Sequence, residues 1–338
     1  MTAERDGDRR GPSGRLVTPP TQALRLSWVD LLLLVALAIA WGSAYLFIRE
    51  GLVFGAGPLL FASSRYLLSA AAFAALAAVR REPFPDRTSL LVSAGVGGIL
   101  IIGLYGALLY VGELNTTGGY ASVLSASAPI LTVVIAYAVI PAERLGRTGQ
   151  LGLGLGFAGV VVLVLPSLGQ GAIGTWPGPE LVLAAFVSAA LGTVWLRRIG
   201  RGRQGLWQIG TQFAVAGAFV GGGAALDPAG EALPLTPPVL EALAALVVLS
   251  SVVGYFVYFT LHHRVGPVRA NLVAYLLPLV GVGIGTGLLG EPASIFELGG
   301  FVIVIAGLTL ILREASRGPA SDSGATGRVD PGSTHDPD

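Results

Sequence analysis

Residues 120–166 read YASVLSASAPILTVVIAYAVIPAERLGRTGQLGLGLGFAGVVVLVLP, and residues 271–313 repeat their plan as NLVAYLLPLVGVGIGTGLLGEPASIFELGGFVIVIAGLTLILR. Each stretch has an apolar segment with a proline near its middle, then a glutamate at a short polar hinge, then a second apolar segment. Nine residues separate the hinge glutamate from the first matched glycine (Glu143 to Gly152, and Glu291 to Gly300). An Ala-Gly pair ends 16 residues after the glutamate in both copies, at Gly159 and at Gly307. Several matches at one offset indicate an internal repeat, which has to be recognised before single motifs are interpreted.

A second pair of motifs supports the repeat. Residues 41–45 read WGSAY, and residues 191–195 read LGTVW, at an offset of 150. The stretches quoted first are offset by 148. The chain therefore divides into two halves of about 140 residues, each with five apolar segments.

The composition is that of a membrane protein with many spans. Of the 338 residues 53% are hydrophobic and 12% are charged, and the mean hydropathy is +0.73. A soluble domain has about 25% charged residues. The 49 glycines favour close helix packing in a bilayer. The absence of cysteine excludes disulfides and thiol chemistry. No basic face interleaved with aromatic residues remains outside the spans, so we expect no nucleic-acid partner.

The apolar segments have the length of membrane-spanning helices. Most have 18 to 24 residues, and a helix needs about 20 to cross about 30 Å of hydrocarbon. Their apolar runs are continuous, which excludes the in-out alternation of a β-barrel. They lie at 28–48, 59–79, 89–110, 119–140, 150–166, 179–197, 207–226, 239–262, 269–289 and 295–312.

The arginines test this map. With ten spans and the N-terminus inside, 19 of the 21 arginines fall in cytoplasmic stretches. Arg49 alone lies outside, and Arg65 lies within a span. This asymmetry is what the positive-inside rule requires. The sequence thus predicts an all-α integral membrane protein with ten transmembrane helices. Because five helices per half is an odd number, the second half enters the membrane inverted, and inverted repeats allow alternating access.

The predicted organisation has four parts. A disordered cytoplasmic tail covers 1–27, a first five-helix repeat covers 28–166, a second covers 179–313, and a second disordered cytoplasmic tail covers 314–338. We expect a multi-pass protein of the cell inner (plasma) membrane with both termini in the cytoplasm.

These residues resemble a family, the EamA-type carriers of the drug/metabolite transporter superfamily. The resemblance covers about 28–313 and rests on the repeated hinge blocks and on Trp41-Gly42-Ser43, Arg65-Tyr66 and Ser125-Ala126-Ser127-Ala128-Pro129. It implies ten helices in two inverted repeats, both termini cytoplasmic, a central substrate cavity, and fifth and tenth helices outside that cavity. Members move amino acids, purines, drugs and other metabolites, so it does not identify the substrate. The second copy departs from the first: Pro292 stands where the first has Arg144, and its opening motif lacks the tryptophan.

Arg65 is the strongest candidate for a substrate contact. It lies about a third of the way into its span, at a depth where a charged side chain is costly and normally faces a cavity or a partner. It could anchor an anionic substrate group such as a carboxylate. The alternative is a structural arginine that caps carbonyl groups or extends toward the outer interface.

Aromatic and amide side chains make up the rest of the predicted cavity lining. Tyr and Asn offer hydrogen bonds beside apolar surface, which suits a small amphipathic ligand. Ordinary packing or hydrogen bonding between helices is the alternative for each of them. The candidates are Trp41, Tyr105, Trp195, Tyr255, Asn271 and Tyr275.

Two further roles are predicted within the spans. Pro129 and Pro278 each remove a helix hydrogen bond and can kink a span, so both are candidate hinges. No carboxylate lies at the middle of a span, and Glu113, near the outer end of the third, is the candidate for proton coupling. Without coupling the carrier is an exchanger or a uniporter.

We therefore expect a secondary carrier that exports a small amino-acid-like or drug-like solute by alternating access around a midplane cavity. The alternative is a non-transporting membrane scaffold or sensor. No catalytic triad, phosphate loop, nucleotide signature or metal cluster is present, so we expect neither an enzyme nor a cofactor. The expected partners are the solute and membrane lipid, and a homodimer is left open.

Overall fold

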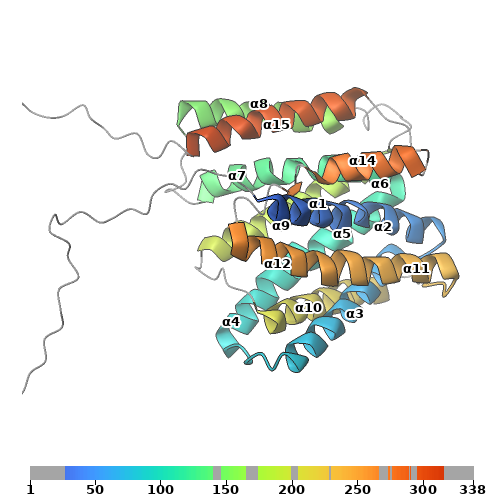
Figure 1. Cartoon of the computed structure of the whole chain (residues 1–338). Helices are drawn as coiled ribbons and strands as arrows, with labels where there is room; N and C mark the ends of the chain where they lie inside the picture. The colour runs from blue at the N-terminus through green and yellow to red at the C-terminus, as the bar shows by residue number, and fades with distance from the viewer. Residues whose placement is uncertain are drawn as a thin grey trace, which may run out of the picture.

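The protein is all-helical in the computed structural model (Figure 1). The structure describes residues 27–139, 146–164, 174–198, 205–227, 230–265, 273–274, 276–288, 290 and 295–315. Within these ranges there is no β-strand, and the β-type pairing is an isolated bridge between Thr116 and Gly174. This confirms the predicted all-α class. The expected tails lie outside the described residues, apart from Ser27, Glu314 and Ala315.

The helices fall on the predicted apolar segments. Six stretches are long and apolar enough to cross a membrane: Trp28–Val53, Pro58–Val79, Arg87–Asn115, Gly118–Val139, Gly178–Leu196 and Pro237–Tyr258. The full count of ten spans stays a prediction. In the first half the helices are α1 (Trp28–Gly42), α2 (Ala44–Val53), α3 (Pro58–Val79), α4 (Arg87–Val92), α5 (Tyr105–Gly112), α6 (Gly118–Leu124), α7 (Ser127–Val139) and α8 (Arg147–Val164). In the second half they are α9 (Gly178–Arg198), α10 (Leu206–Ala225), α11 (Pro237–Ala245), α12 (Gly254–Val265), α14 (Leu277–Leu288) and α15 (Ile295–Ala315).

Two helices contain long π-helical stretches at matching places. The π-helix η1 (Ser93–Leu104) joins α4 to α5, and the π-helix η5 (Leu246–Val253) joins α11 to α12. A short 3₁₀ turn, η2 (Glu113–Asn115), follows α5. π-helical turns are rare in proteins, and those that do occur often lie at functional sites. Their occurrence in the third predicted span of each half fits a duplicated architecture.

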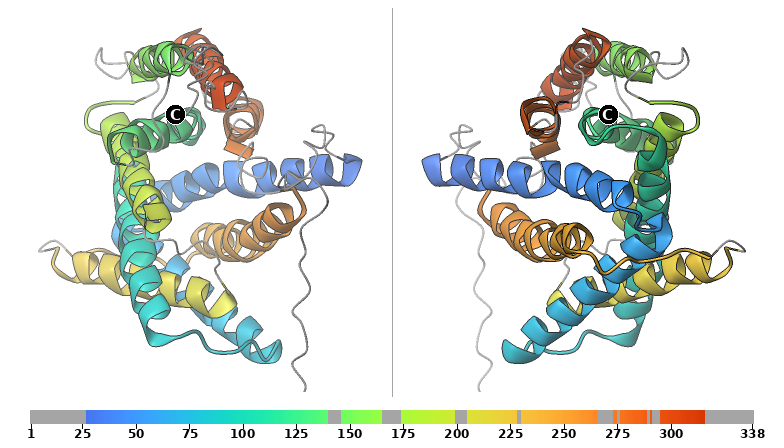
Figure 2. Two further views of the ribbon diagram at one scale, coloured as in Figure 1. Left: turned by 90° about the vertical axis from the view of Figure 1, so that its left-hand side faces the viewer. Right: turned by 90° about the vertical axis from the view of Figure 1, so that its right-hand side faces the viewer.

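The repeated glycines bring α8 and α15 together. A Cβ atom on Gly159 would lie 3.0 Å from the carbonyl oxygen of Gly300, and one on Gly307 would lie 2.5 Å from that of Gly152. The early glycine of each helix meets the late glycine of the other, so the two helices are antiparallel. Small residues permit this close approach. Figure 1 and both views of Figure 2 show α8 and α15 as a pair at one side of the molecule.

The other packed pairs follow the same symmetry. α3 lies against α10, α6 against α14, α1 against α12, and α9 against η1. Exchanging each predicted span for its counterpart in the other half leaves this set of pairs unchanged. α3 and α10 are also antiparallel, because Gly210 faces Phe73 near one end while Gly217 faces Leu67 farther along. These contacts fit two repeats of opposite orientation.

The predicted fourth span is broken near its middle. α6 ends at Leu124 and α7 begins at Ser127, so Pro129 is the third residue of a new helix. Pro278 is likewise the second residue of α14. Proline fits the first turn of a helix, where its missing N–H is not needed. Each proline thus lies in the first turn of a helix and does not kink a continuous one. The hinge role stays a prediction.

Serine hydroxyl groups bond to backbone carbonyl groups at this break. The hydroxyl of Ser125 donates to the carbonyl oxygen of Ser122 over 2.5 Å, and that of Ser127 donates to Leu124 over 2.6 Å. Unpaired backbone groups within a membrane cost several kcal/mol each. The serine-rich sequence before Pro129 therefore makes an interrupted helix tolerable.

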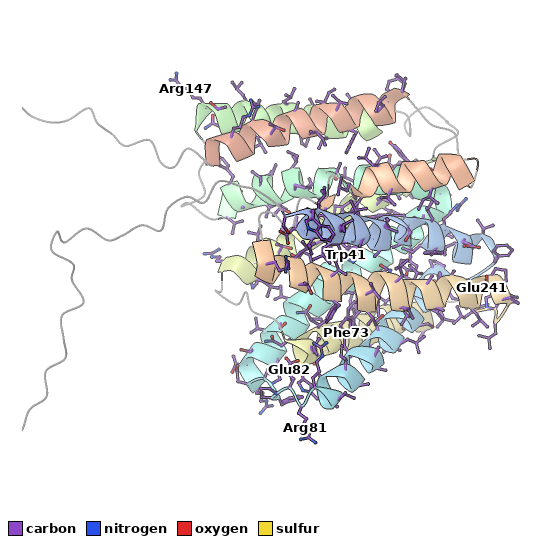
Figure 3. The ribbon with its side chains drawn as sticks, in the orientation of Figure 1. Trp41, Phe73, Arg81, Glu82, Arg147 and Glu241 are labelled. Carbon is purple, nitrogen blue, oxygen red and sulfur yellow. The ribbon has the colours of Figure 1, made fainter. Side chains whose placement is uncertain are left out.

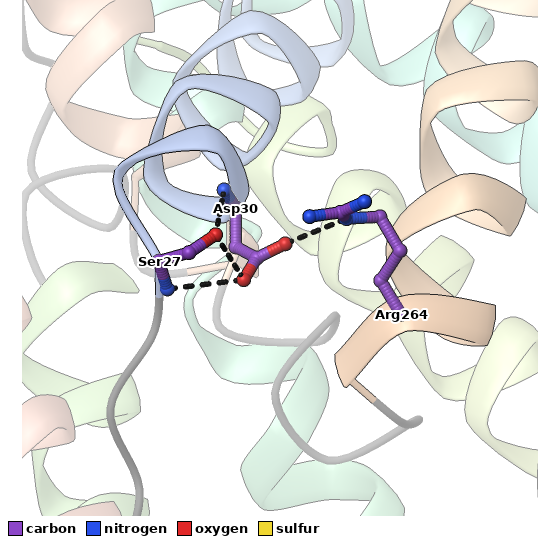
Figure 4. A network of polar contacts seen from close by, with 3 residues as sticks. All are labelled: Ser27, Asp30 and Arg264. Carbon is purple, nitrogen blue, oxygen red and sulfur yellow. Dashed lines mark hydrogen bonds and ion pairs between the residues drawn. The ribbon is translucent and has the colours of Figure 1, made fainter.

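The beginning of α1 is tied to α12 by a polar network (Figure 4). Ser27 and Asp30 form a capping box, in which Asp30 N donates to Ser27 Oγ over 3.2 Å and Ser27 N donates to Asp30 Oδ2 over 3.0 Å. The second carboxylate oxygen of Asp30 pairs with Nε of Arg264 over 2.8 Å. This network joins the first helix of one half to the third predicted span of the other.

Candidate functional site: a cavity between the two repeats

A cavity of about 290 Å³ lies between the two halves. Its lining comes from α1 and α2, α3, η1 and α5, the α6–α7 break, α9, α10, η5 and α12, and α14. In its described part neither α8 nor α15 contributes a residue. This agrees with the expectation that the fifth and tenth predicted helices stand outside the cavity. Figure 3 shows Trp41 in the body of the molecule and Arg147 at its edge, where α8 begins.

Arg65 lies in the cavity wall and joins both halves. Its Nη2 donates to Oγ of Ser250 over 2.9 Å, and its Nε donates to Oγ of Ser251 over 3.3 Å, both on η5. Its Nη1 donates to the hydroxyl of Tyr110 on α5 over 3.2 Å. The guanidinium carbon lies 5.7 Å from the centre of the Tyr66 ring. One side chain of α3 is thus held by residues of the first half and of the second.

The charge of Arg65 is not neutralised by these contacts. Ser250, Ser251 and Tyr110 are all uncharged, and Arg65 is the sole charged residue in the described lining. A cation away from bulk water is costly unless an anion or several dipoles compensate it. The cavity therefore presents a positive site among neutral walls.

Aromatic rings form much of the remaining wall. The indole of Trp41 donates to the carbonyl oxygen of Ser250 over 3.1 Å and packs on Tyr255, with ring centres 5.8 Å apart. Tyr255 in turn packs edge-on against Phe213 of α10 at 5.3 Å. Tyr105 and Phe186 of α9 also line the cavity, with ring centres 5.6 Å apart. These rings combine apolar surface with hydroxyl groups that can reach a polar ligand.

The structure brings four of the predicted substrate contacts together and separates one. Trp41, Arg65, Tyr105 and Tyr255 all line the cavity. Trp195 does not belong to the described lining and is 53% exposed. At about 100° per residue, the nine residues from Phe186 to Trp195 amount to two and a half turns of α9. Because Phe186 faces the cavity, Trp195 faces away from it. Asn271 and Tyr275 lie outside the described residues.

Sequence reasoning missed Ser250 and Tyr110, which hold Arg65 in place. In an α-helix, Ser251, four residues before Tyr255, would share the face of Tyr255. In the π-helix η5 the repeat is widened toward five residues, and Ser250, five residues before Tyr255, lines the cavity with it. A π-helical turn leaves no clear mark in the sequence. Tyr110 has 0% exposure in the structure. In the sequence nothing distinguished it from a packing residue.

Glu113 is not among the residues that line the cavity. It begins η2, is fully buried, and does not belong to the described lining. Its carbonyl oxygen accepts a hydrogen bond from Nη1 of Arg49 over 2.7 Å. A part in coupling therefore stays a prediction. Among the described residues, no three His, Asp or Glu side chains gather as a metal site would require.

Both halves of the chain match one known protein family. The family described as "EamA-like transporter family" matches residues 28–165 and, a second time, residues 176–313. The chain belongs to the EamA-like transporter family. It is accordingly a membrane transporter, and the resemblance read from its motifs is confirmed.

Curated EamA-like relatives align along most of their length. "Uncharacterized inner membrane transporter YedA" of Escherichia coli K12 is 29% identical over 82% of this chain and 89% of its own. "Uncharacterized transporter YvbV" of Bacillus subtilis is 29% identical over 83% and 90%. "Probable amino-acid metabolite efflux pump" of Salmonella typhimurium is 27% identical over 84% and 94%. A solved crystal structure at 18% identity covers 86% of this EamA-like chain and 99% of its own with a TM-score of 0.58, which shows a shared fold.

Proposed function

We propose that this EamA-like protein is a secondary carrier that exports a small amino-acid-like or drug-like solute by alternating access. The observation that carries the proposal is Arg65, a cation without a described acidic partner in a cavity between two antiparallel repeats. Ten helices with both termini in the cytoplasm are part of the same proposal. The placement of 19 of 21 arginines supports that topology.

The cavity suits a small solute with an acidic group. A carboxylate next to Arg65 would supply the missing negative charge and form charge-assisted hydrogen bonds. The aromatic rings around it would hold an apolar body. Ligand cavities commonly measure about 300–1,000 Å³, so a volume of about 290 Å³ favours a ligand at the small end of that range.

Export is the proposed direction. Two relatives, from Salmonella typhimurium and Escherichia coli K12, bear the name "Probable amino-acid metabolite efflux pump". Their names concern those proteins, and they support amino-acid-like solutes as the first class to test here. Glu113 is the proposed coupling residue, and the helix starts at Pro129 and Pro278 are the proposed hinges.

The test is a metabolite profile of the medium from cells that express the wild type, Arg65→Ala, Arg65→Lys or an empty vector. Arg147→Ala is the matched control, because Arg147 begins α8 away from the cavity. We expect a solute that accumulates outside with the wild type and with Arg147→Ala, and that is lost with Arg65→Ala. Arg65→Lys should retain part of the flux, since it keeps the charge but loses the forked geometry.

Three outcomes would contradict the proposal. The same solute composition in the media of the wild type and the empty vector would argue against export. Uptake into proteoliposomes that contain the purified protein would then be measured. Unchanged flux with Arg65→Ala at equal expression would reduce Arg65 to a structural role. A partner that co-purifies with the protein, with no solute flux in either direction, would favour a scaffold or sensor.

A further inference from the structure

We infer that Glu82 and Glu231 are positioning residues that clamp α3 and α10 together at both ends, so that the pair carrying Arg65 stays joined at both faces during transport. Each glutamate lies in the loop that leaves one of the two helices and caps the beginning of the other. The part of this inference that concerns transport rests on the proposed function. The clamp itself rests on the contacts below.

The first cap lies where α3 ends and α10 begins. The backbone N–H of Leu206, the first residue of α10, donates to both carboxylate oxygens of Glu82 over 2.9 and 3.1 Å. The indole N–H of Trp207 donates to the carbonyl oxygen of Glu82 over 3.0 Å. Phe84 packs on the Trp207 ring at 5.3 Å between centres. The loop from the first half therefore holds the start of a helix in the second half.

The second cap lies at the opposite end, where α10 ends and α3 begins. The backbone N–H of Leu60, the third residue of α3, donates to Oε2 of Glu231 over 2.6 Å. The N–H of Gly57, the residue before α3, donates to the carbonyl oxygen of Ala232 over 2.7 Å. A Cβ atom on Gly57 would lie 2.5 Å from Cβ of Glu231, so only glycine allows this approach. Here the loop from the second half holds a helix of the first.

The two caps are built alike. Arg81, before Glu82, has φ = 52°, and Gly230, before Glu231, has φ = 69°, so a left-handed residue turns the chain toward each cap. The following residues read EPFP from Glu82 and EALP from Glu231, at an offset of 149. Both helix starts have glycine as the preceding residue. The repeat has therefore duplicated the cap together with the helices.

A carboxylate at a helix N-terminus satisfies free N–H groups and opposes the positive end of the helix dipole. Because the caps stand at opposite ends of one antiparallel pair, opening either end means losing its cap. Both caps are closed at once in this structure. The α3–α10 pair carries Arg65, Tyr66 and Phe213 into the cavity wall. The clamp thus fixes the position of the proposed substrate anchor, and the rearrangement that opens the cavity must occur between other helices.

A disulfide tests whether the pair separates. The ideal Cβ position at Gly221 on α10 lies 3.5 Å from Cβ of Ser63 on α3, within the range that a disulfide requires. The natural chain has no cysteine, so Ser63→Cys with Gly221→Cys gives one defined crosslink. Mass spectrometry measures its formation. Counterflow of a mixture of radiolabelled L-amino acids into proteoliposomes is then measured for the oxidised and the reduced protein, with each single cysteine variant as control.

We expect the oxidised protein to retain transport within about twofold of the reduced protein. Loss of transport on oxidation that a reductant restores would overturn the inference, because it would show that α3 and α10 must separate. If the wild-type protein moves none of the amino acids, the proposed substrate class fails, and the clamp is decided by hydrogen exchange alone.

Hydrogen exchange measures the caps without any substrate. Glu82→Ala should accelerate amide exchange at the start of α10 by roughly five- to tenfold and leave the start of α3 unchanged. Glu231→Ala should do the reverse. Glu82→Gln and Glu231→Gln should each restore part of the protection, because the amide oxygen still accepts a hydrogen bond. Glu241→Ala, on the exposed side of α11, is the matched control. Unchanged exchange at the capped end would overturn the clamp.

Discussion

Nη2 of Arg65 lies 2.9 Å from the hydroxyl oxygen of Ser250, so the charge of a first-repeat helix is held by a π-helical turn of the second repeat. Nε of the same arginine reaches Ser251 at 3.3 Å. Together with Tyr110, these serines take three of the five N–H groups of Arg65, so a solute can bond to Arg65 while the serines hold it in place. Binding therefore acts directly on a contact between the two halves.

Ser250→Ala should weaken solute binding with little change in the amount of folded protein. A hydrogen bond from a charged donor contributes about 1.5–3 kcal/mol, and a looser Arg65 loses part of its orientation. We expect the half-saturating solute concentration in proteoliposomes to rise roughly five- to tenfold. Ser188→Ala is the control, because Ser188 also bonds between helices but is absent from the described lining. An equal effect of both substitutions would speak against a role in orientation.

Trp41→Ala should reduce transport strongly, whereas Trp195→Ala should leave it near the wild-type rate. Trp41 contacts Ser250 and Tyr255 in the cavity wall, but Trp195 is turned away from it. Initial transport rates at equal protein density compare the two. The two tryptophans begin and end the matched motifs, so an equal loss in both variants would show that the motif matters through packing and not through the cavity.

Gly307→Ala should destabilise the protein by about 1–3 kcal/mol. Its new methyl group would lie 2.5 Å from the carbonyl oxygen of Gly152, and α8 cannot retreat without losing its other contacts. Thermal unfolding in detergent measures the change. Gly299→Ala on the same helix is the matched control, because nothing in the described structure lies within 4 Å of its Cβ position. A similar shift in both variants would mean that glycine acts through helix propensity alone.

Arg81→Gly should stabilise the folded state by up to about 1 kcal/mol. Arg81 has φ = 52°, a conformation that glycine adopts without strain. The neighbouring Arg80 has φ = −77°, and Arg80→Gly should instead destabilise the protein. Figure 3 shows Arg81 at the edge of the molecule, pointing away from it. If both substitutions lower the unfolding temperature, the side chain of Arg81 makes a contact that outweighs its strain.

The sequence predicted the features that depend on long-range patterns. The all-helical class, the matched glycines of the fifth and tenth predicted spans, and Arg65 within a wall of aromatic residues follow from apolar length, matched spacing and the cost of a buried charge. These patterns are visible in the sequence because the membrane constrains every residue of a span.

The features that it missed depend on local departures from the α-helix. Ser250 lines the cavity because η5 is π-helical, and an α-helical wheel cannot place it. Pro129 was expected within a continuous helix, but the serines before it allow the chain to end one helix and begin another. No role was predicted for Glu82 or Glu231. Their shared Glu-x-x-Pro pattern could have identified them, had the loops been compared as the spans were.

The glycine contacts between α8 and α15 have an evolutionary consequence. Gly159 meets Gly300, and Gly152 meets Gly307, so each contact is the image of the other with the two copies exchanged. A surface that recognises itself in this way is what a symmetric homodimer uses. A shorter ancestral polypeptide with one copy, inserted into the membrane in both orientations, would assemble through the same two contacts. Gene fusion would then have fixed one orientation for each copy and left the old dimer interface inside a single chain.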